Sequence, residues 1–260
     1  MLASERQKKI LDHVILQGSA TTEELCRFTG ASAATIRRDI NKLAAQQLLL
    51  HTHGGAQAVY PDPVVLSERH VLREDDPNLS LKEALARKAT DLVEDGDVIY
   101  IGAGMTCNLL SRHLSEKSLS NITVATTNVT AVMELAHNSN VKMLLMGGNI
   151  HAGRNHIETI DNYTAASLEK YYFKKVFFTV DGADLQYGYS IINREQISLY
   201  NYLLENSEQQ YLLVSREKFG KRAFTIFAEL DRIPNIITNF PVPDDYLNFY
   251  TSQRINVILA

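Results

Sequence analysis

The chain has 260 residues, with 26 Lys and Arg side chains against 30 Asp and Glu, which gives a formal net charge of −4. Hydrophobic residues make up 45% and charged residues 22%, which is typical of a folded protein and excludes wholesale disorder. The longest apolar runs are far shorter than the ~20 residues that a membrane-spanning helix requires, and residues 1–11 are too polar for a signal peptide. We therefore expect a cytoplasmic protein of one or two domains that engages no membrane.

The cysteine content points to the same compartment. Cys26 and Cys107 are the two cysteines of the chain, too few for a disulfide framework or a cysteine-rich zinc site. Such a composition fits a reducing compartment. Neither a metal ion nor a cofactor is expected.

Charge is distributed unevenly along the chain. Residues 1–58 carry seven Lys or Arg against five Asp or Glu, whereas the remaining residues carry 19 against 25. A basic head on an acidic body favours binding of nucleic acid by the head. Two prolines near residue 62 make a stiff, non-helical joint. We therefore predict a DNA-binding domain over residues 1–58, a linker over 59–79 and a second domain over 80–260. Within the linker, residues 66–72 are predicted to form a short helix.

The head is predicted to form three helices followed by a hairpin. Apolar residues at helical spacing predict a first helix over 4–17, and Thr21 with Glu24 forms a capping box before a second helix. Ser32 caps a third helix, and the segment 48–56 predicts a two-stranded wing. A short helix, a tight turn, a helix with a basic start and a hairpin are typical of a winged helix-turn-helix.

The third helix carries most of the residues that we expect to contact DNA. Ile36, Ile40 and Leu43 recur at helical spacing and face inward, which leaves polar side chains on the outer face. Small residues there allow close approach to a groove, and arginine bonds phosphate or guanine edges. With the histidines of the wing, the predicted DNA-binding residues are Ser32, Thr35, Arg37, Arg38, Asn41, Lys42, His51 and His53.

Other residues of the head have structural interpretations. Asp39 is expected to orient an arginine or to cap the chain locally, because DNA would repel its carboxylate. His51 and His53 have the spacing of metal ligands but no third ligand is near in the sequence, so phosphate contacts or plain wing residues are favoured. Cys26 lies on the apolar face of the second helix and is expected in the core.

The head also contains a run of nine residues, Ser32-Ala33-Ala34-Thr35-Ile36-Arg37-Arg38-Asp39-Ile40, with Arg6 and Ile10 before it and Gly54-Gly55-Ala56 after it. In this arrangement, which covers nearly all of residues 4–57, the head resembles that of the DeoR family of repressors. The resemblance implies that Ser32, Thr35, Arg37 and Arg38 contact DNA.

Helical and strand patterns alternate beyond the linker. Predicted strands cover residues 98–101, 122–125, 141–146, 175–180, 210–214, 236–238 and 255–259. A helix is predicted over 81–93, before the first strand. A second helix starts over 108–114, after the first strand, and a third follows the second strand and ends at residue 137. Strands separated by helices form βαβ units, so the predicted fold class is α/β, a winged helix-turn-helix followed by a mostly parallel α/β sensor domain. Ligands of such sheets bind beyond the carboxyl ends of the strands.

Those strand ends carry groups that suit an anion and hydroxyls. The loop 102–104 opens a helix whose free amides and dipole attract an anion, and Thr106 adds a hydroxyl. Lys218 adds an ammonium after a later strand, while Asp181 and Asp184 supply carboxylates for hydroxyls. The sequence therefore predicts a site for a phosphorylated polyol.

The same part of the chain contains Lys82, the loop 102–106, Thr127-Asn128, Gly147-Gly148, Asp181-Gly182, Glu195 and Lys218-Phe219-Gly220. Through them, roughly residues 80–240 resemble the effector-sensing domain of the DeoR family, whose fold is similar to ribose 5-phosphate isomerase. The resemblance implies a sugar phosphate with its phosphate on the glycine loop. The predicted effector-binding residues are Gly102, Gly104, Met105, Thr106, Thr127, Asn128, Gly147, Gly148, Asp181, Glu195 and Lys218.

Five positions depart from the usual pattern of that family. Gly102 stands in place of Asp, Met105 in place of Ser and Asn201 in place of Lys, while Ser215 and Glu217 replace the usual Asp and Ser before the Lys-Phe-Gly motif. Met105 lacks a phosphate-binding hydroxyl, and Glu217 places a negative charge beside the lysine. We therefore expect an atypical or differently placed ligand.

These features favour a DNA-binding transcriptional regulator, a repressor of a carbohydrate-metabolism operon that responds to a phosphorylated sugar or related metabolite. The first alternative is a constitutive DNA-binding protein whose body only oligomerises. The second is an isomerase-like enzyme, for which we identify no complete catalytic set around residues 181–184. The predicted partners are double-stranded operator DNA, a small-molecule effector and further copies of the chain in a dimer or tetramer.

Overall fold

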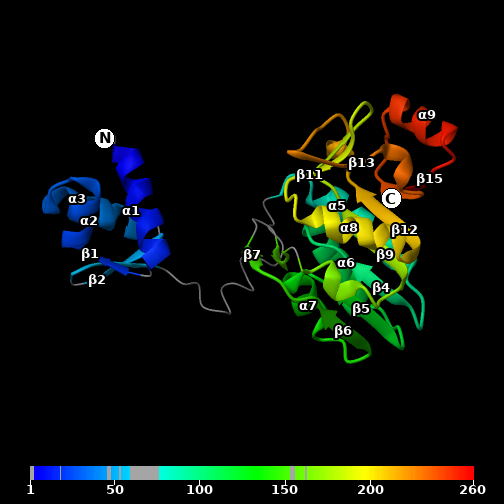
Figure 1. The fold of residues 1–260 in the computed structure, drawn as a ribbon, viewed down its shortest axis with the longest axis horizontal. Helices are drawn as coiled ribbons and strands as arrows, with labels where there is room; N and C mark the ends of the chain where they lie inside the picture. Colours follow the sequence, from blue (N-terminus) through cyan, green and yellow to red (C-terminus); the bar gives the residue numbers. More distant parts are fainter. Residues whose placement is uncertain are drawn as a thin grey trace. The chain divides into compact units, whose positions relative to one another are not determined.

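The computed structural model describes residues 3–17, 19–45, 48–52, 54–58, 76–152, 156–161 and 163–260. They form two compact units, which divide between residues 65 and 66 (Figure 1). Most of the predicted linker, including its helix over 66–72, lies outside the described residues. No helix in the described ranges is long and apolar enough to cross a membrane.

The N-terminal unit contains three helices and a small antiparallel sheet. The helices are α1 (Ala3–Gln17), α2 (Thr22–Thr29) and α3 (Ala33–Ala45), and the strands β1 (Ser19–Thr21), β2 (Leu49–Thr52) and β3 (Gly55–Ala58) pair in the order β1-β3-β2. The predicted helices and hairpin are confirmed. Strand β1 was not predicted, because three residues between two helices are too few to reveal the two-residue period of a strand.

Local chemistry explains where these elements begin and end. The Thr21 hydroxyl accepts a hydrogen bond from the Glu24 amide at 3.2 Å and the Glu24 carboxylate accepts one from the Thr21 amide at 2.7 Å, which is the predicted capping box. Gly30 ends α2 with a φ of 71°, a left-handed conformation that glycine adopts without strain. Cys26 is half-buried and packs against the core of this unit.

The C-terminal unit is built on a parallel sheet in the order β15-β14-β12-β9-β4-β5-β6 (Figure 1). These strands are β4 (Val98–Ile101), β5 (Ile122–Thr126), β6 (Val141–Leu145), β9 (Phe173–Thr179), β12 (Ser207–Val214), β14 (Asn235–Thr238) and β15 (Asn256–Leu259). The helices are α5 (Leu79–Asp91), α6 (Met105–Glu116), α7 (Val129–Leu135), α8 (Gln196–Glu205) and α9 (Asp244–Ser252), with the 3-10 turns η1 (Ala166–Leu168), η2 (Arg216–Lys218) and η3 (Leu230–Arg232). The predicted α/β class and all seven predicted strands are confirmed.

Two smaller sheets complete this unit. Strands β10 (Gly182–Asp184), β11 (Gly188–Ile191) and β13 (Thr225–Ala228) form one of them, and β7 (Ile150–Ala152) pairs with β8 (Ile157–Thr159). The Thr159 amide donates to the Thr127 carbonyl at 2.8 Å, so β8 lies at the carboxyl end of β5. Strand β10 begins just after the carboxyl end of β9. These short elements were not predicted, and they flank the edge of the sheet where a ligand was expected.

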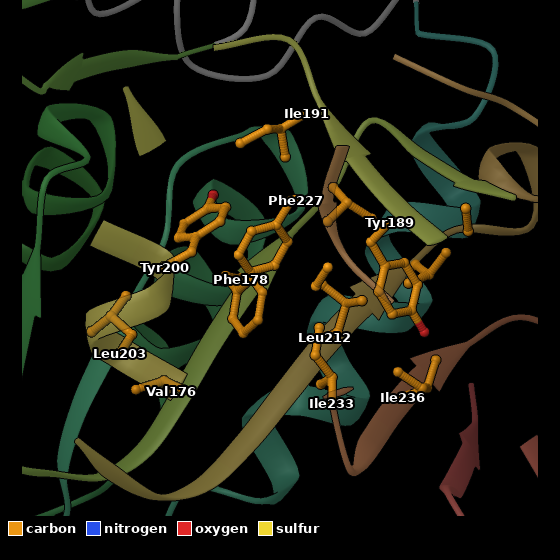
Figure 2. Packing of buried hydrophobic residues seen from close by; sticks show 14 of the residues in the cluster. Val176, Phe178, Tyr189, Ile191, Tyr200, Leu203, Leu212, Phe227, Ile233 and Ile236 are labelled. Atoms are coloured by element: carbon orange, nitrogen blue, oxygen red, sulfur yellow. The ribbon is translucent and has the colours of Figure 1, made fainter. Parts of the chain in front are cut away.

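Both faces of the parallel sheet are buried. Alternate residues of β9 belong to two separate hydrophobic clusters: Phe178 packs in one and Phe177 in the other. In the first, the Phe178 ring lies 4.9 Å from Tyr200 of α8, which in turn lies 5.3 Å from Phe227 of β13 (Figure 2). Burial on both faces explains why the strands read as continuous apolar runs.

Candidate functional site

The outer face of α3 presents the side chains that were predicted to contact DNA. Arg37, Arg38, Asn41 and Lys42 are exposed, opposite the buried Ile36, Ile40 and Leu43. The first turn of α3 carries no acidic residue, so the positive end of the helix dipole is unopposed there. This face is therefore basic and open to solvent.

The remaining predicted contacts lie at the start of α3 and on the wing. The Ser32 hydroxyl accepts a hydrogen bond from the Thr35 amide at 3.3 Å and lies 2.9 Å from the Thr35 hydroxyl. His51 is exposed on β2, whereas His53 lies outside the described residues. DNA contact by these residues stays a prediction.

Asp39 is the one charged residue of the run 32–40 that is buried, whereas Arg37 and Arg38 are exposed. The residue is 3% exposed, and its carboxylate accepts hydrogen bonds from Arg6 Nε at 2.6 Å and Gln7 Nε2 at 2.8 Å. Burial alone would raise the pKa of Asp39, but the bonds from Arg6 and Gln7 outweigh it and hold that pKa below its ordinary value. The expectation that Asp39 orients an arginine is confirmed, and the pair fastens α1 to α3.

We expect Asp39→Ala to destabilise the N-terminal unit by about 2–3 kcal/mol, because it leaves Arg6 and Gln7 without their buried acceptor. Hydrogen exchange on the full chain would measure this as faster exchange of α1 and α3 amides, with the amides of the parallel sheet unaffected. Asp12→Ala, at an exposed acid of α1, is the matched control and is expected to change the stability by less than about 0.5 kcal/mol. Equal exchange in the two variants would contradict the fastening role.

The carboxyl edge of the parallel sheet contains a cavity of about 130 Å³. Five of the residues predicted for the effector site line it: Gly104, Met105, Thr106, Asp181 and Lys218. Six others complete its wall: Lys82, His156, Thr179, Val180, Leu213 and Ser215. Three protonatable nitrogen groups thus share one small cavity with a single carboxylate.

The cavity is suited to an anion. Gly104 begins α6 with no side-chain cap, so the first amides of that helix have no partner within it and the positive end of its dipole faces the loop. Lys218 lies at the end of η2, and its Nζ is 4.0 Å from Asp181 Oδ1. The other oxygen of Asp181 accepts the Ile192 amide at 2.8 Å, which fixes the carboxylate.

Two buried side chains hold the lysine-bearing segments in place. The Tyr246 hydroxyl accepts the Gly220 amide at 2.9 Å and donates to the Ala183 carbonyl at 2.8 Å, which anchors the loop after Lys218. Asn239, 2% exposed, donates to the Leu81 carbonyl at 3.0 Å, immediately before Lys82. Its Oδ1 also accepts the Arg216 amide at 3.4 Å.

A second, more open groove of about 730 Å³ adjoins the cavity and shares His156 and Asp181 with it. Its polar wall includes Glu158, which is 3% exposed and accepts hydrogen bonds from Gln196 Nε2 at 3.0 and 3.2 Å. Burial alone would raise the pKa of Glu158, but the His156 ring and the Gln196 amide outweigh it and hold that pKa below its ordinary value. An ionised Glu158 carboxylate beside the Gln196 side-chain amide is suited to hydrogen bonds with the hydroxyl groups of a ligand.

Several predicted effector residues lie beneath or beside these cavities instead of lining them. Gly102 is buried, and a Cβ there would lie 3.0 Å from the Phe178 Cβ, so the residue allows β4 and β9 to approach. Thr127 and Asn128 are also buried; the Thr127 hydroxyl lies 3.0 Å from that of Tyr100, and the Asn128 side chain caps α7. An effector contact at these residues stays a prediction.

The other predicted residues lie at the β7–β8 side of the sheet edge. Gly148 leaves no room for a side chain, since a Cβ would lie 2.9 Å from the Ile160 amide, and the Gly147 carbonyl accepts the Thr164 hydroxyl at 3.1 Å. Glu195 Oε2 lies 3.2 Å from His151 Nε2, beside the open groove.

The positions that depart from the family pattern are accommodated locally. Met105 lines the cavity, whereas the Glu217 carboxylate accepts the Ser215 hydroxyl at 2.6 Å. Asn201 accepts Arg232 NH1 at 2.7 Å and does not line the cavity.

Comparison with known proteins agrees with both units. The sequence profile of the DeoR-like helix-turn-helix domain matches residues 6–61, and that of the DeoR C terminal sensor domain matches residues 77–239. The HTH-type transcriptional regulator IolR of Bacillus subtilis is 25% identical over 98% of each chain. The glycerol-3-phosphate regulon repressor of Escherichia coli is 27% identical over 100% of each chain.

Among solved structures, ribose 5-phosphate isomerase A of Methanocaldococcus jannaschii is similar over 55% of each chain, with 21% identity and a TM-score of 0.39. At that score the likeness says nothing about a ligand or a reaction. The two family profiles match both units, and the relatives are named as a transcriptional regulator and a repressor, which sets aside the enzyme alternative. The chain belongs to the DeoR family of transcriptional regulators.

Proposed function

We propose that this regulator is a cytoplasmic repressor whose hold on operator DNA is controlled by a phosphorylated sugar or polyol bound at the carboxyl edge of the parallel sheet. DNA would bind at the outer face of α3, through Ser32, Thr35, Arg37, Arg38 and neighbouring residues. A dimer or tetramer would present several such helices to repeated half-sites.

The convergence of Lys82, Lys218 and the uncapped start of α6 on one cavity carries this proposal. Two ammonium groups and free helix amides are the donors that a phosphate group requires. The adjoining groove, with Glu158 and Gln196 in its wall, supplies acceptors and donors for hydroxyls. The glycerol-3-phosphate regulon repressor of Escherichia coli, to which this chain is similar, is named for a phosphorylated polyol.

Titration of the protein against its own upstream DNA by fluorescence anisotropy tests the proposal. The salt concentration should be fixed near about 150 mM, because phosphate contacts make such affinities strongly salt-dependent. Specific binding that a pool of phosphorylated sugars weakens would support control by an effector. Binding that ignores the pool would favour the constitutive alternative.

Lys218→Ala is expected to raise the effector concentration required for half-maximal release of DNA by at least about tenfold, because a charge-assisted hydrogen bond contributes roughly 1.5–3 kcal/mol. The same anisotropy assay measures it once the pool has been resolved. Lys221→Ala removes an equal charge from an exposed neighbour that does not line the cavity, and is expected to leave the response unchanged. An unchanged response in Lys218→Ala would contradict the location of the site.

A further inference from the structure

One of the two cavity lysines, Lys82, already has a carboxylate partner within the protein. Lys82 Nζ contacts Asp76 Oδ2 at 2.5 Å, and the side chains of the two residues are only 13% and 12% exposed. The second oxygen of Asp76 accepts the Asn78 amide at 2.9 Å. Burial alone would raise the pKa of Asp76, but the bonds from Lys82 and Asn78 outweigh it and keep the carboxylate ionised well below neutral pH.

The negative charge of Asp76 acts on both cavity lysines. Besides its direct contact with Lys82, the carboxylate is stabilised through space by Lys218. Asp76 is therefore a carboxylate of the protein itself that lies at the edge of the cavity. The two lysines of that cavity are suited to an anionic ligand. A phosphate group that binds Lys82 must share or displace this carboxylate, and must overcome its repulsion.

Asp76 also lies at a particular place in the chain. It is the first described residue after 59–75, the segment that leads from the N-terminal unit, and its carbonyl accepts the Leu79 amide at 2.9 Å at the start of α5. The Lys82 amide donates to the Asn78 carbonyl at 3.1 Å in the same turn. The Asp76–Lys82 pair thus closes the turn that leads into α5.

We propose that Asp76 is an internal competitor for Lys82, which a bound phosphate group displaces, so that occupancy of the cavity loosens the turn that leads into α5. This inference rests on the proposed function of the cavity. It assigns Asp76 a positioning role: the residue sets the affinity for the effector by holding Lys82, without being a ligand of the effector itself.

Titration calorimetry with inorganic phosphate at constant ionic strength tests the competition. Asp76→Asn is expected to bind phosphate about tenfold more tightly than the unaltered protein, because it frees Lys82 and removes the repulsion, whereas Lys82→Met is expected to bind about tenfold more weakly. Asp76→Glu, which keeps the carboxylate, should restore weaker binding. Asp91→Asn makes the same charge change at an exposed residue near the other end of α5 and should match the unaltered protein.

Hydrogen exchange at the Asn78 amide tests the loosened turn. Saturating phosphate is expected to speed this exchange in the unaltered protein by several-fold and to leave it unchanged in Asp76→Asn, where the acceptor is already weakened. A purely structural role for Asp76 would give no such dependence on phosphate.

The outcomes separate the two proposals. If Lys82→Met and Lys218→Ala lose phosphate binding while Asp76→Asn binds as the unaltered protein does, the cavity is the effector site and the competition is wrong. If neither inorganic phosphate nor the sugar phosphate pool binds the unaltered protein or Asp76→Asn, the proposed site falls and the competition with it.

Discussion

Arg37→Ala is expected to lower the affinity for operator DNA by roughly 5- to 150-fold, the range of about 1–3 kcal/mol that one specific arginine contact contributes. Arg37 is exposed on the outer face of α3, and the first turn of that helix has no acidic residue to compete for it. Nothing in the core depends on this side chain, so thermal unfolding of the variant should be unchanged.

Fluorescence anisotropy over a series of salt concentrations distinguishes the two ways in which the arginine can act. Loss of a phosphate contact weakens binding to all sequences and reduces the salt slope by about 1. Loss of a base contact leaves that slope nearly unchanged and relaxes discrimination at one base pair of the site.

Lys8→Ala provides the matched control, because it removes one positive charge from an exposed position of α1. A small loss of affinity in this variant and a large one in Arg37→Ala would assign recognition to α3. Equal losses would show that only the overall charge of the N-terminal unit matters, and would remove α3 from its reading role.

The elements that the sequence reveals are those whose pattern repeats. Helix α3 shows three inward residues at helical spacing, and β9 is long enough for a buried apolar run to be unmistakable. Strands β7, β8 and β10 have three residues each, too few for any period, and their pairing is decided by tertiary contacts. The groove that adjoins the cavity is built on such strands, which is why Glu158 went unrecognised.

Those residues of the candidate site that come directly after a strand in the sequence could be predicted. Gly104, Asp181 and Lys218 all follow strands of the parallel sheet, and all three line the cavity. Lys82 lies on a helix, and a hydrogen bond from Asn239, 158 positions away, holds the residue before it. Such long-range placement has no local signature, although the family resemblance did include Lys82. Conversely, Thr127 follows a strand but is buried in the core, where its hydroxyl lies within hydrogen-bond distance of the Tyr100 hydroxyl.

The opposite, amino-terminal edge of the sheet contains a buried ionic cluster that serves stability. Lys175 of β9 is 4% exposed, and its Nζ bonds Asp97 Oδ2 at 2.8 Å, the Leu92 carbonyl at 2.7 Å and Glu94 Oε2 at 3.0 Å. Asp97 is fully buried before β4, with Lys174 Nζ 2.7 Å from its other oxygen. The cluster fastens β9 to the turn between α5 and β4.

Lys175→Met is expected to lower the free energy of unfolding by about 3 kcal/mol, near the bottom of the range for breaking one side of a buried ion pair, because Lys174 still faces Asp97. Lys174→Met removes the same charge from a side chain that is 41% exposed and is expected to lower the free energy of unfolding much less. Urea unfolding followed by circular dichroism measures both. If both variants lose a similar, small amount of unfolding free energy, the cluster behaves as a surface ion pair.

The double variant Asp97→Asn with Lys175→Met should recover part of the loss, because it leaves no unpaired charge in the interior.

Burial alone would raise the pKa of Asp97, but hydrogen bonds from Lys174, Lys175 and the Glu94 amide outweigh it and hold that pKa below its ordinary value of 3.8. An acid with a lowered pKa in the folded state stabilises the fold above its ordinary pKa, and that contribution is lost as the pH falls through the lowered value. The difference in stability between the unaltered protein and Lys175→Met should therefore be full at pH 7 and narrow as the pH falls below about 4. A difference that stays constant over that range would mean that Lys175 acts through its packing and its bond to the Leu92 carbonyl, not through the charge of Asp97.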